Sequence, residues 1–132
     1  MRHTITKEDE GKIIYAIPTG NNARSYEKDD GPISFLVKKV KRKYVDLSQV
    51  YHDGSYGRIM PFHPTTGATQ QMIAAGYGGN AGYMFFKTKD DVSRHWLESG
   101  MRRDISDFFA RRSFELDFDD MATIHNIIMG DK

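Results

Sequence analysis

ISFLVKKVKRKYVDL, at residues 33–47, holds two β-prone runs, ISFLV and YVDL, on either side of a short basic segment. Five of the six residues from Lys38 to Lys43 are Lys or Arg. This pattern is typical of an antiparallel hairpin whose strands place apolar side chains in a core and whose tip carries positive charge into water. The segment therefore predicts a sheet in the first half of the chain and a basic surface at the end of one hairpin.

The composition is that of one folded domain. The 132 residues carry 19 basic and 18 acidic side chains and no cysteine. The lack of Cys excludes disulfides, thiolate metal sites and cysteine nucleophiles, and a net charge of +1 does not match a general nucleic-acid coat protein. No apolar run approaches the roughly 20 residues of a membrane span, and the polar N-terminus lacks the apolar segment of a secretory signal. We therefore expect a soluble protein of the cytoplasm, without membrane partners.

Four more β-prone segments accompany the hairpin. They lie at residues 12–17, 58–63, 68–73 and 83–86. The first should end at Pro18, and the second and third should form a hairpin around the turn at residues 64–67. Pro61 should place its strand at a sheet edge or a bulge. We therefore predict a small antiparallel β-barrel of about five strands over residues 11–87.

Three polar or glycine-rich segments lie outside these strands. Residues 1–10 predict a loose arm or a short turn. Residues 19–32 are long for an unstructured connection within a compact domain, so this loop should be functional or mobile. Residues 75–82 read AGYGGNAG, and their four glycines predict a flexible or tightly turning segment.

From Thr88 onward the apolar residues recur at helical spacing. Thr88 predicts the start of a helix that runs to about Arg112, with a kink or break at Ser99–Gly100. Asp117 predicts the cap of a last helix that Gly130 ends. The apolar positions are Leu97, Met101, Ile105 and Phe108 in the first helix and Met121, Ile124 and Ile128 in the second. We expect these faces to pack on each other or across the barrel end, which gives one α+β domain over residues 1–132 with its helical part at 88–130.

Four segments, in their order along the chain, carry a resemblance to a known group. They read VKRKYVDL (40–47), FHPTTG (62–67), FKTKDD (86–91) and LDFDDMATIHNII (116–128). The chain resembles the small, mostly uncharacterised "beta barrel domain" proteins of bacteriophages and prophages over most of its length. The resemblance implies a phage origin and an SH3-like barrel followed by a helix and a shorter closing helix, but no activity. One departure is Lys41, where the group tends to have Gly at the hairpin tip.

The basic hairpin is the main candidate for a binding surface. Clustered Lys and Arg can meet phosphates or an acidic protein surface, and nearby tyrosines can stack on bases or pack on a partner. The alternative is a solvated tip whose lysines protect a sheet edge against aggregation. The candidate binding residues are Lys38, Lys39, Lys41, Arg42, Lys43, Tyr44, Tyr51, Tyr56 and Tyr77.

Motifs for catalysis, metal binding or cofactor binding are weak. The five histidines include no pair at helical i, i+4 spacing, so they predict no metal site. The acidic pairs at residues 90–91 and 119–120 are explained by helix starts, and the glycines of 76–82 lack the Lys-Ser/Thr of a phosphate-binding loop. We therefore expect no catalytic residue and no cofactor, although a pocket that gathers His52, Asp53 and His63 would favour a hydrolase-type enzyme.

These observations, with the resemblance, predict a non-enzymatic binding protein. Its partner would be a host protein or a protein–nucleic-acid machine, in host takeover or counter-defence. Long loops that bear Tyr26, Tyr51, Tyr56 and Tyr77 on a rigid scaffold suit such an interface. The alternative is an accessory protein that binds DNA or RNA directly through Lys38–Lys43.

Overall fold

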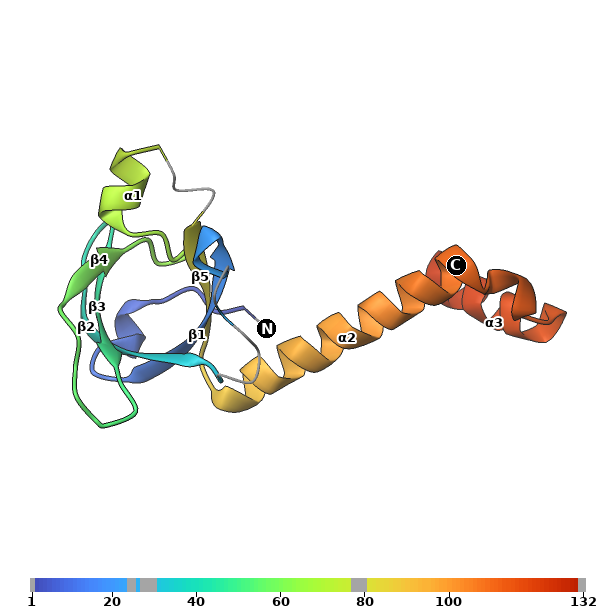
Figure 1. The fold of residues 1–132 in the computed structure, drawn as a ribbon, viewed down its shortest axis with the longest axis horizontal. Helices are drawn as coiled ribbons and strands as arrows, with labels where there is room; N and C mark the ends of the chain where they lie inside the picture. The colour runs from blue at the N-terminus through green and yellow to red at the C-terminus, as the bar shows by residue number, and fades with distance from the viewer. Residues whose placement is uncertain (1, 24–25, 27–30, 77–80, 131–132) are drawn as a thin grey trace. The chain divides into compact units, whose positions relative to one another are not determined.

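The computed structural model describes residues 2–23, 26, 31–76 and 81–130. The chain divides into unit 1, Met1–His95, which holds the sheet, and unit 2, Trp96–Lys132, which is helical (Figure 1). Among the described residues, no helix is both long enough and apolar enough to cross a membrane.

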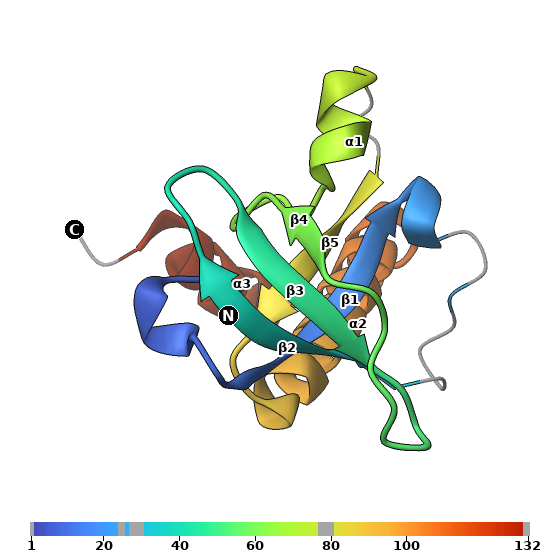
Figure 2. The ribbon, with the colours of Figure 1, turned by 90° about the vertical axis from the view of Figure 1, so that its left-hand side faces the viewer.

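Five antiparallel strands form one sheet in unit 1. They are β1 (Ile13–Gly20), β2 (Ile33–Val40), β3 (Val45–Val50), β4 (Met60–Phe62) and β5 (Ala81–Phe86). Their order across the sheet is β4-β3-β2-β1-β5 (Figure 2). With the helices that follow, this sheet confirms the predicted α+β class. Between the described strands no ladder joins β4 to β5, so the sheet is open at these two edges.

The β2–β3 hairpin confirms the prediction made from residues 33–47. Val37 pairs with Leu47, and the next pair is Lys39 with Asp46, so Lys38 is the extra residue of a β-bulge. Alternate residues of both strands point to the same side of the sheet. The buried members of this alternation are Phe35 and Val37 of β2 and Val45 and Leu47 of β3.

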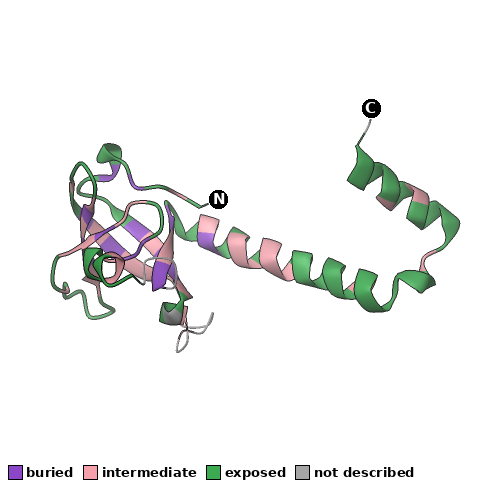
Figure 3. Cartoon of the chain, turned by 90° about the horizontal axis from the view of Figure 1, so that it is seen from above, coloured by how far each residue is buried: buried purple, intermediate pink, exposed green. Residues whose placement is uncertain are grey.

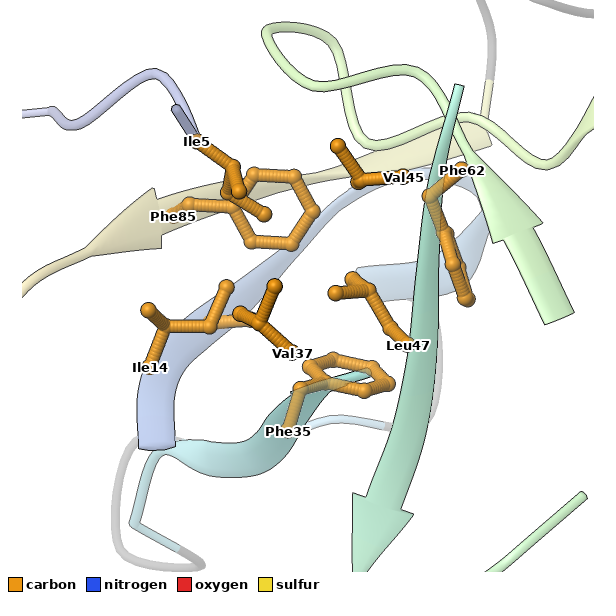
Figure 4. Packing of buried hydrophobic residues seen from close by; sticks show 9 residues of the cluster. Ile5, Ile14, Phe35, Val37, Val45, Leu47, Phe62 and Phe85 are labelled. Carbon is orange, nitrogen blue, oxygen red and sulfur yellow. The ribbon is translucent and has the colours of Figure 1, made fainter. Parts of the chain in front are cut away.

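The core lies on this inner side of the sheet (Figure 4). Phe35 lies at its centre. The centroid of its ring is 5.4 Å from that of Phe62 and 6.4 Å from that of Phe85, and both pairs have edge-to-face geometry. The other members are Ile5, Ile14, Ala16, Val37, Val45 and Leu47. One continuous cluster therefore joins all five strands to the N-terminal segment.

The N-terminal segment is attached to the sheet, so of the two predicted alternatives the loose arm is wrong and the short turn is confirmed at residues 7–9. The His3 N–H donates to the Phe85 carbonyl at 2.7 Å, and the Ile5 N–H donates to the Pro64 carbonyl at 3.1 Å. Ile5 is buried in the core, and the short 3-10 helix η1 (Lys7–Asp9) follows it. The segment is polar in composition, but its single Ile and its backbone N–H groups attach it to the sheet.

The predicted strand at residues 68–73 is also wrong. The structure has the helix α1 (Gln70–Ala74) there, and Thr69 caps it by accepting the Met72 N–H at 3.2 Å. The segment has a weak preference for strand, and its Gln, Met and Ala residues give it a weak preference for helix. The Thr69 cap therefore decides that it is helical. Only an isolated bridge from Phe62 to Thr69 remains of the expected hairpin.

Strand β1 continues past Pro18, where the sequence predicted its end. Pro18 pairs with Tyr83 of β5, whereas the pairing of β1 with β2 stops at Ala16. Beyond Ala16, β1 is paired with β5 only. Pro18 has no N–H to donate, but no strand lies on the β2 side at this point, so no ladder hydrogen bond is lost there. The 3-10 helix η2 (Asn21–Ala23) follows.

Two helices and a short turn complete the chain. The Thr88 hydroxyl accepts the Asp91 N–H at 3.1 Å, and α2 (Lys89–Arg111) then runs without interruption through Ser99–Gly100. The predicted break is wrong, because Gly lowers helix propensity by only about 1 kcal/mol and removes no backbone bond. The 3-10 helix η4 (Ser113–Glu115) and α3 (Phe118–Met129) follow, and Asp117 caps α3 by accepting the Asp120 N–H at 2.8 Å.

The apolar faces of the two helices are not buried within unit 2 (Figure 3). Leu97 is 64 % exposed and Ile128 is 70 % exposed, whereas only Phe108 and Ile124 of the predicted stripes are half-buried. The two faces border an open groove instead of closing on each other. The helical spacing is therefore confirmed, and the two helices do not bury these faces against each other. The alternative that the faces pack across the barrel end stays a prediction.

Candidate functional site

The basic tip joins β2 to β3. The Lys41 N–H donates to the Tyr44 carbonyl at 3.0 Å, which leaves Arg42 and Lys43 at the end of the hairpin. No described non-glycine residue has a positive φ, so Lys41 fits this turn without the strain that a glycine-type turn would impose. The five basic residues Lys38, Lys39, Lys41, Arg42 and Lys43 are all exposed.

Acidic groups partly balance this charge. Nζ of Lys41 lies 3.0 Å from Oδ2 of Asp46, and Lys39 is paired across the ladder with the same residue. Glu10 also reaches this hairpin, because its carboxylate accepts the Val40 N–H at 2.8 Å. Exposed ion pairs contribute little to stability. The tip nevertheless offers less net charge to a phosphate backbone than its sequence indicates.

The candidate tyrosines do not gather at the basic tip. Tyr44 is half-buried there, with Nζ of Lys43 lying 5.5 Å from its ring centroid. Tyr51 and Tyr56 belong to the loop after β3, at the opposite end of that strand from the tip (Figure 2). Tyr77 lies outside the described residues. The sequence therefore predicted one surface where the structure places two separate ones.

A cavity of about 330 Å³ lies beside the inner side of the sheet, and we call it the sheet cleft. Buried Phe35, Leu47 and Phe62 of the core form part of its lining. Its other lining residues are Asn22, Gln49, Tyr51, Gly57, Arg58, Met60, Thr69, Met72, Ala81 and Tyr83. The lining is therefore mixed, with apolar core side chains beside polar ones, and binding sites commonly combine apolar surface with polar groups that orient the bound group.

Several side chains hold the shape of the sheet cleft. The Tyr83 ring lies 5.4 Å from Phe35 and 6.0 Å from Phe62, and burial raises the pKa of its hydroxyl above 10.0. Asn22 donates from Nδ2 to the Gly82 carbonyl at 3.0 Å, which ties η2 to β5 at this cavity. Thr69 lines the sheet cleft and also caps α1. Three separate elements therefore fix the walls.

A second cavity of about 260 Å³ adjoins the sheet cleft, and we call it the side pocket. Gln49 and Tyr51 line both cavities. The side pocket is completed by Tyr26, Gly31, Pro32, Ile33, Ser34, Val50 and His52. The two cavities are therefore neighbours on unit 1, and Gln49 and Tyr51 lie between them.

Sequence reasoning found Tyr51 but missed Gln49 and the other cleft residues. Leu47, Gln49 and Tyr51 lie two residues apart, and all three line the sheet cleft. Because a strand places alternate residues on one side, a core-facing Leu47 already predicts that Gln49 and Tyr51 share its side. Arg58 and Met72 come from a loop and from α1, and no local pattern marks them.

The candidate catalytic groups do not converge. Asp53 caps its own turn, where the Ser55 hydroxyl and N–H donate to its carboxylate and lower its pKa below 3.8. Nδ1 of His63 accepts the Thr65 and Thr66 N–H groups at 3.1 and 3.2 Å. His52 borders the side pocket, but Asp53 and His63 line neither cavity. Among the described residues, no three His or acidic side chains come together as a metal site would need.

One buried charged group was not predicted. Asp9 is 2 % exposed, and its carboxylate accepts the Thr6 N–H at 2.8 Å and lies 2.8 Å from Nε2 of His3. Burial alone would raise the pKa of Asp9, but these hydrogen bonds and the charges of His3 and Lys87 outweigh it and lower the pKa below 3.8. The spacing Thr6-x-x-Asp9 resembles a capping box, and this sequence pattern could have predicted a structural role for Asp9.

Comparisons of the chain with family models, with curated proteins and with solved structures found no match.

Proposed function

We propose that this chain is a non-enzymatic binding protein that docks on another protein through the sheet cleft and the side pocket. The observation that carries the proposal is Tyr51, which is 47 % exposed and borders both cavities. An exposed aromatic ring beside two cavities is the type of residue that anchors protein interfaces.

The sheet edges favour side-chain insertion over strand addition. The N-terminal segment donates the His3 N–H to β5, which covers part of that edge. Strand β4 has only three residues, and Pro61 has no N–H to offer. A partner segment therefore gains little by pairing its backbone with this sheet. It gains more by placing apolar side chains in the sheet cleft and polar ones near Gln49 and Arg58.

The partner and the barrel type belong to the same proposal. The resemblance to phage proteins supports a host protein or a protein–nucleic-acid machine of the host cytoplasm as the partner, in host takeover or counter-defence. We also infer an SH3-like barrel, because the segment after β4 reaches β5. The Tyr83 N–H donates to the Thr66 carbonyl at 3.1 Å, and Thr69 bridges to Phe62.

The proposal is tested by co-purification from host lysate at moderate salt, followed by mass spectrometry. The variant Tyr51→Ala/Arg58→Ala removes two cleft residues with little expected effect on the fold, because both are exposed. The matched control Tyr56→Ala removes a ring that is 61 % exposed and lines neither cavity. We expect the first variant to lose the partner that the wild-type chain retains, and the control to keep it.

Two results contradict the proposal. One is a wild-type chain that retains no host protein. The other is a partner whose retention is the same for Tyr51→Ala/Arg58→Ala as for the wild type, since the cleft would then play no part in docking.

Direct nucleic-acid binding is the second candidate, and the five exposed basic residues of the hairpin favour it. The variant Lys38→Glu/Arg42→Glu/Lys43→Glu tests it without touching Lys39 and Lys41, which face Asp46. Each lost phosphate contact should reduce the slope of log affinity against log salt by about 0.9. DNA or RNA retention that this variant leaves unchanged excludes the hairpin as the contact.

A further inference from the structure

The segment after β3 folds back on that strand and brings Arg58 beside the sheet cleft. The Gly57 N–H donates to the Gln49 carbonyl at 2.8 Å, and the Gly57 carbonyl accepts the Ser48 hydroxyl at 2.7 Å. Ser48 is buried, so this second contact attaches the segment to the interior of unit 1. The backbone at Gly57 is therefore fixed, and Arg58 follows it directly.

Tyr51 packs on the same segment. A Cβ placed on Gly57 would lie 3.0 Å from the Tyr51 hydroxyl oxygen and 3.3 Å from Cε2 of its ring, so the ring lies against the glycine backbone. Gln49, Tyr51 and Arg58 all line the sheet cleft. An amide, a phenol hydroxyl and a guanidinium are therefore brought to one cavity by the turn between β3 and β4.

The formal charge of this lining comes from Arg58. It is the one charged residue among the described residues that line the sheet cleft. Arg58 also lines a third cavity of about 510 Å³, where the other described lining residues are uncharged. Its Nη2 donates to the Met60 sulfur at 3.9 Å, and Met60 lines both cavities. The charge presented by both linings is therefore positive.

No acidic group of the described residues neutralises Arg58. None of the ion pairs between them includes it. Asp53 lies in the preceding loop, but its carboxylate accepts the Ser55 hydroxyl and N–H and lines neither cavity. A guanidinium presents N–H donors in a planar fork that fits a carboxylate through two parallel hydrogen bonds. The charge that complements this lining is therefore negative.

This complementarity favours a single carboxylate over a nucleic-acid backbone. Nucleic acid carries a charge on every phosphate, and proteins bind it with several Lys or Arg side chains. Among the described residues, neither cavity is lined by a second Lys or Arg, and the basic tip lies at the opposite end of β3 (Figure 2). Buried Phe35, Leu47 and Phe62 in the lining favour an apolar group beside the carboxylate.

We propose that Arg58, with Gln49 and Tyr51, recognises a carboxylate, so that the sheet cleft takes an acidic segment of its protein partner. The Asp or Glu side chain of that segment pairs with the guanidinium of Arg58, and a neighbouring large apolar side chain enters the cleft. This recognition rests on the proposed docking through the sheet cleft and adds the chemistry of the segment that docks.

A displayed library of random heptapeptides, selected on the full-length chain, tests this recognition. The wild type should enrich peptides that carry Asp or Glu next to a large apolar residue. Arg58→Glu should lose that preference and select Lys or Arg instead, because the charge of the site is reversed. The matched control is Arg42→Glu, which makes the same charge change at the exposed hairpin tip, away from both cavities. It should keep the wild-type preference, and far-UV circular dichroism checks the fold of each variant.

Calorimetry then compares the most enriched acidic peptide with a counterpart in which an amide replaces the carboxylate. The counterpart should bind the wild type about 10-fold more weakly, because the charge-assisted hydrogen bonds to Arg58 are lost. Tyr51→Ala should weaken the binding of both peptides, which would locate them at the sheet cleft.

Several results overturn the recognition of a carboxylate. They are a library from which the wild type selects nothing, equal binding of the acidic peptide and its amide counterpart, peptide binding that Tyr51→Ala leaves intact, and an acidic preference that Arg58→Glu keeps or Arg42→Glu loses. Docking itself is decided separately by co-purification from host lysate. A host partner that Tyr51→Ala loses and Arg58→Glu retains leaves the docking in place and excludes only the carboxylate.

Discussion

Nε2 of His3 lies 2.8 Å from Oδ2 of Asp9, and this contact attaches the N-terminal segment around a carboxylate that is almost fully buried. The same oxygen accepts the Thr6 N–H. The segment also supplies Ile5 to the core and covers part of the β5 edge. Asp9, which lies in the segment predicted as a loose arm or a short turn, is therefore a structural component of the sheet unit.

The first prediction concerns the pH dependence of stability. The folded state lowers the pKa of Asp9 below 3.8, so its ionised form stabilises the fold above the pKa of the unfolded chain. This contribution is lost as the pH falls through the lower, folded-state pKa. Asp9→Asn should reduce the free energy of unfolding at neutral pH by about 1–3 kcal/mol, because a buried acceptor of the Thr6 N–H is changed.

Urea unfolding between neutral pH and about pH 3 measures this effect. The wild-type chain should lose more stability than Asp9→Asn as the medium becomes acidic. Asp53→Asn is the control, because Asp53 also has a lowered pKa but sits in an exposed turn. Equal acid sensitivity of the wild type and Asp9→Asn would show that Asp9 does not carry this pH dependence.

The second prediction concerns Gly82, where β5 touches the turn after β4. A Cβ placed on Gly82 would collide with the Thr66 carbonyl oxygen and would lie 3.4 Å from the Ala68 N atom. Gly82→Ala must therefore push this turn away from β5, at a cost of about 1–3 kcal/mol. Thermal unfolding measures the loss.

Gly100→Ala is the matched control in helix α2. A Cβ there meets nothing closer than a terminal Arg103 nitrogen at 3.9 Å, so the change should raise helix stability by about 0.5–1 kcal/mol. Opposite signs for the two substitutions are expected. A neutral Gly82→Ala would mean that the turn can move freely and that the sheet is less tightly joined there.

The third prediction concerns the start of α3. Asp117 accepts the Asp120 N–H, and loss of such a cap costs about 1 kcal/mol. Because unit 2 buries little apolar surface of its own, Asp117→Ala should reduce the helical population of α3 while the sheet unit keeps its stability. Carbon chemical shifts from NMR report both regions in one sample. A helical population of α3 that stays unchanged would contradict the prediction.

Local sequence signals predicted the parts of the fold that depend on nearby residues. Alternation in residues 33–47 identified the hairpin, and Thr88 and Asp117 marked both helix starts. The signal failed where distant contacts decide the structure. Pro18 stays within β1 because the β2 ladder has already ended there, and that pairing cannot be seen locally.

The candidate site was predictable only in part, for the same reason. Tyr51 was identified as an exposed aromatic residue, but its role at the border of two cavities depends on Arg58, Met72 and Tyr83, which come from separate elements. The basic residues were correctly expected at the hairpin tip, yet β3 separates them from Tyr51 and Tyr56. Exposure of the helix faces was unpredictable, because a periodic apolar stripe has the same sequence whether it is covered by its own chain or by another one.

The last prediction uses Tyr83 as a reporter of the sheet cleft. Burial raises the pKa of its hydroxyl above 10.0, so the Tyr83 phenol should ionise late in an absorbance titration. The folded state favours the neutral phenol, and stability should therefore fall as the pH rises above the unfolded-state value. Tyr83→Phe should remove the late step and this alkaline loss, whereas the matched change Tyr56→Phe should leave both in place. A partner segment in the sheet cleft would exclude more water from Tyr83 and move the late step to higher pH, and a bound partner that leaves it unmoved must contact another surface.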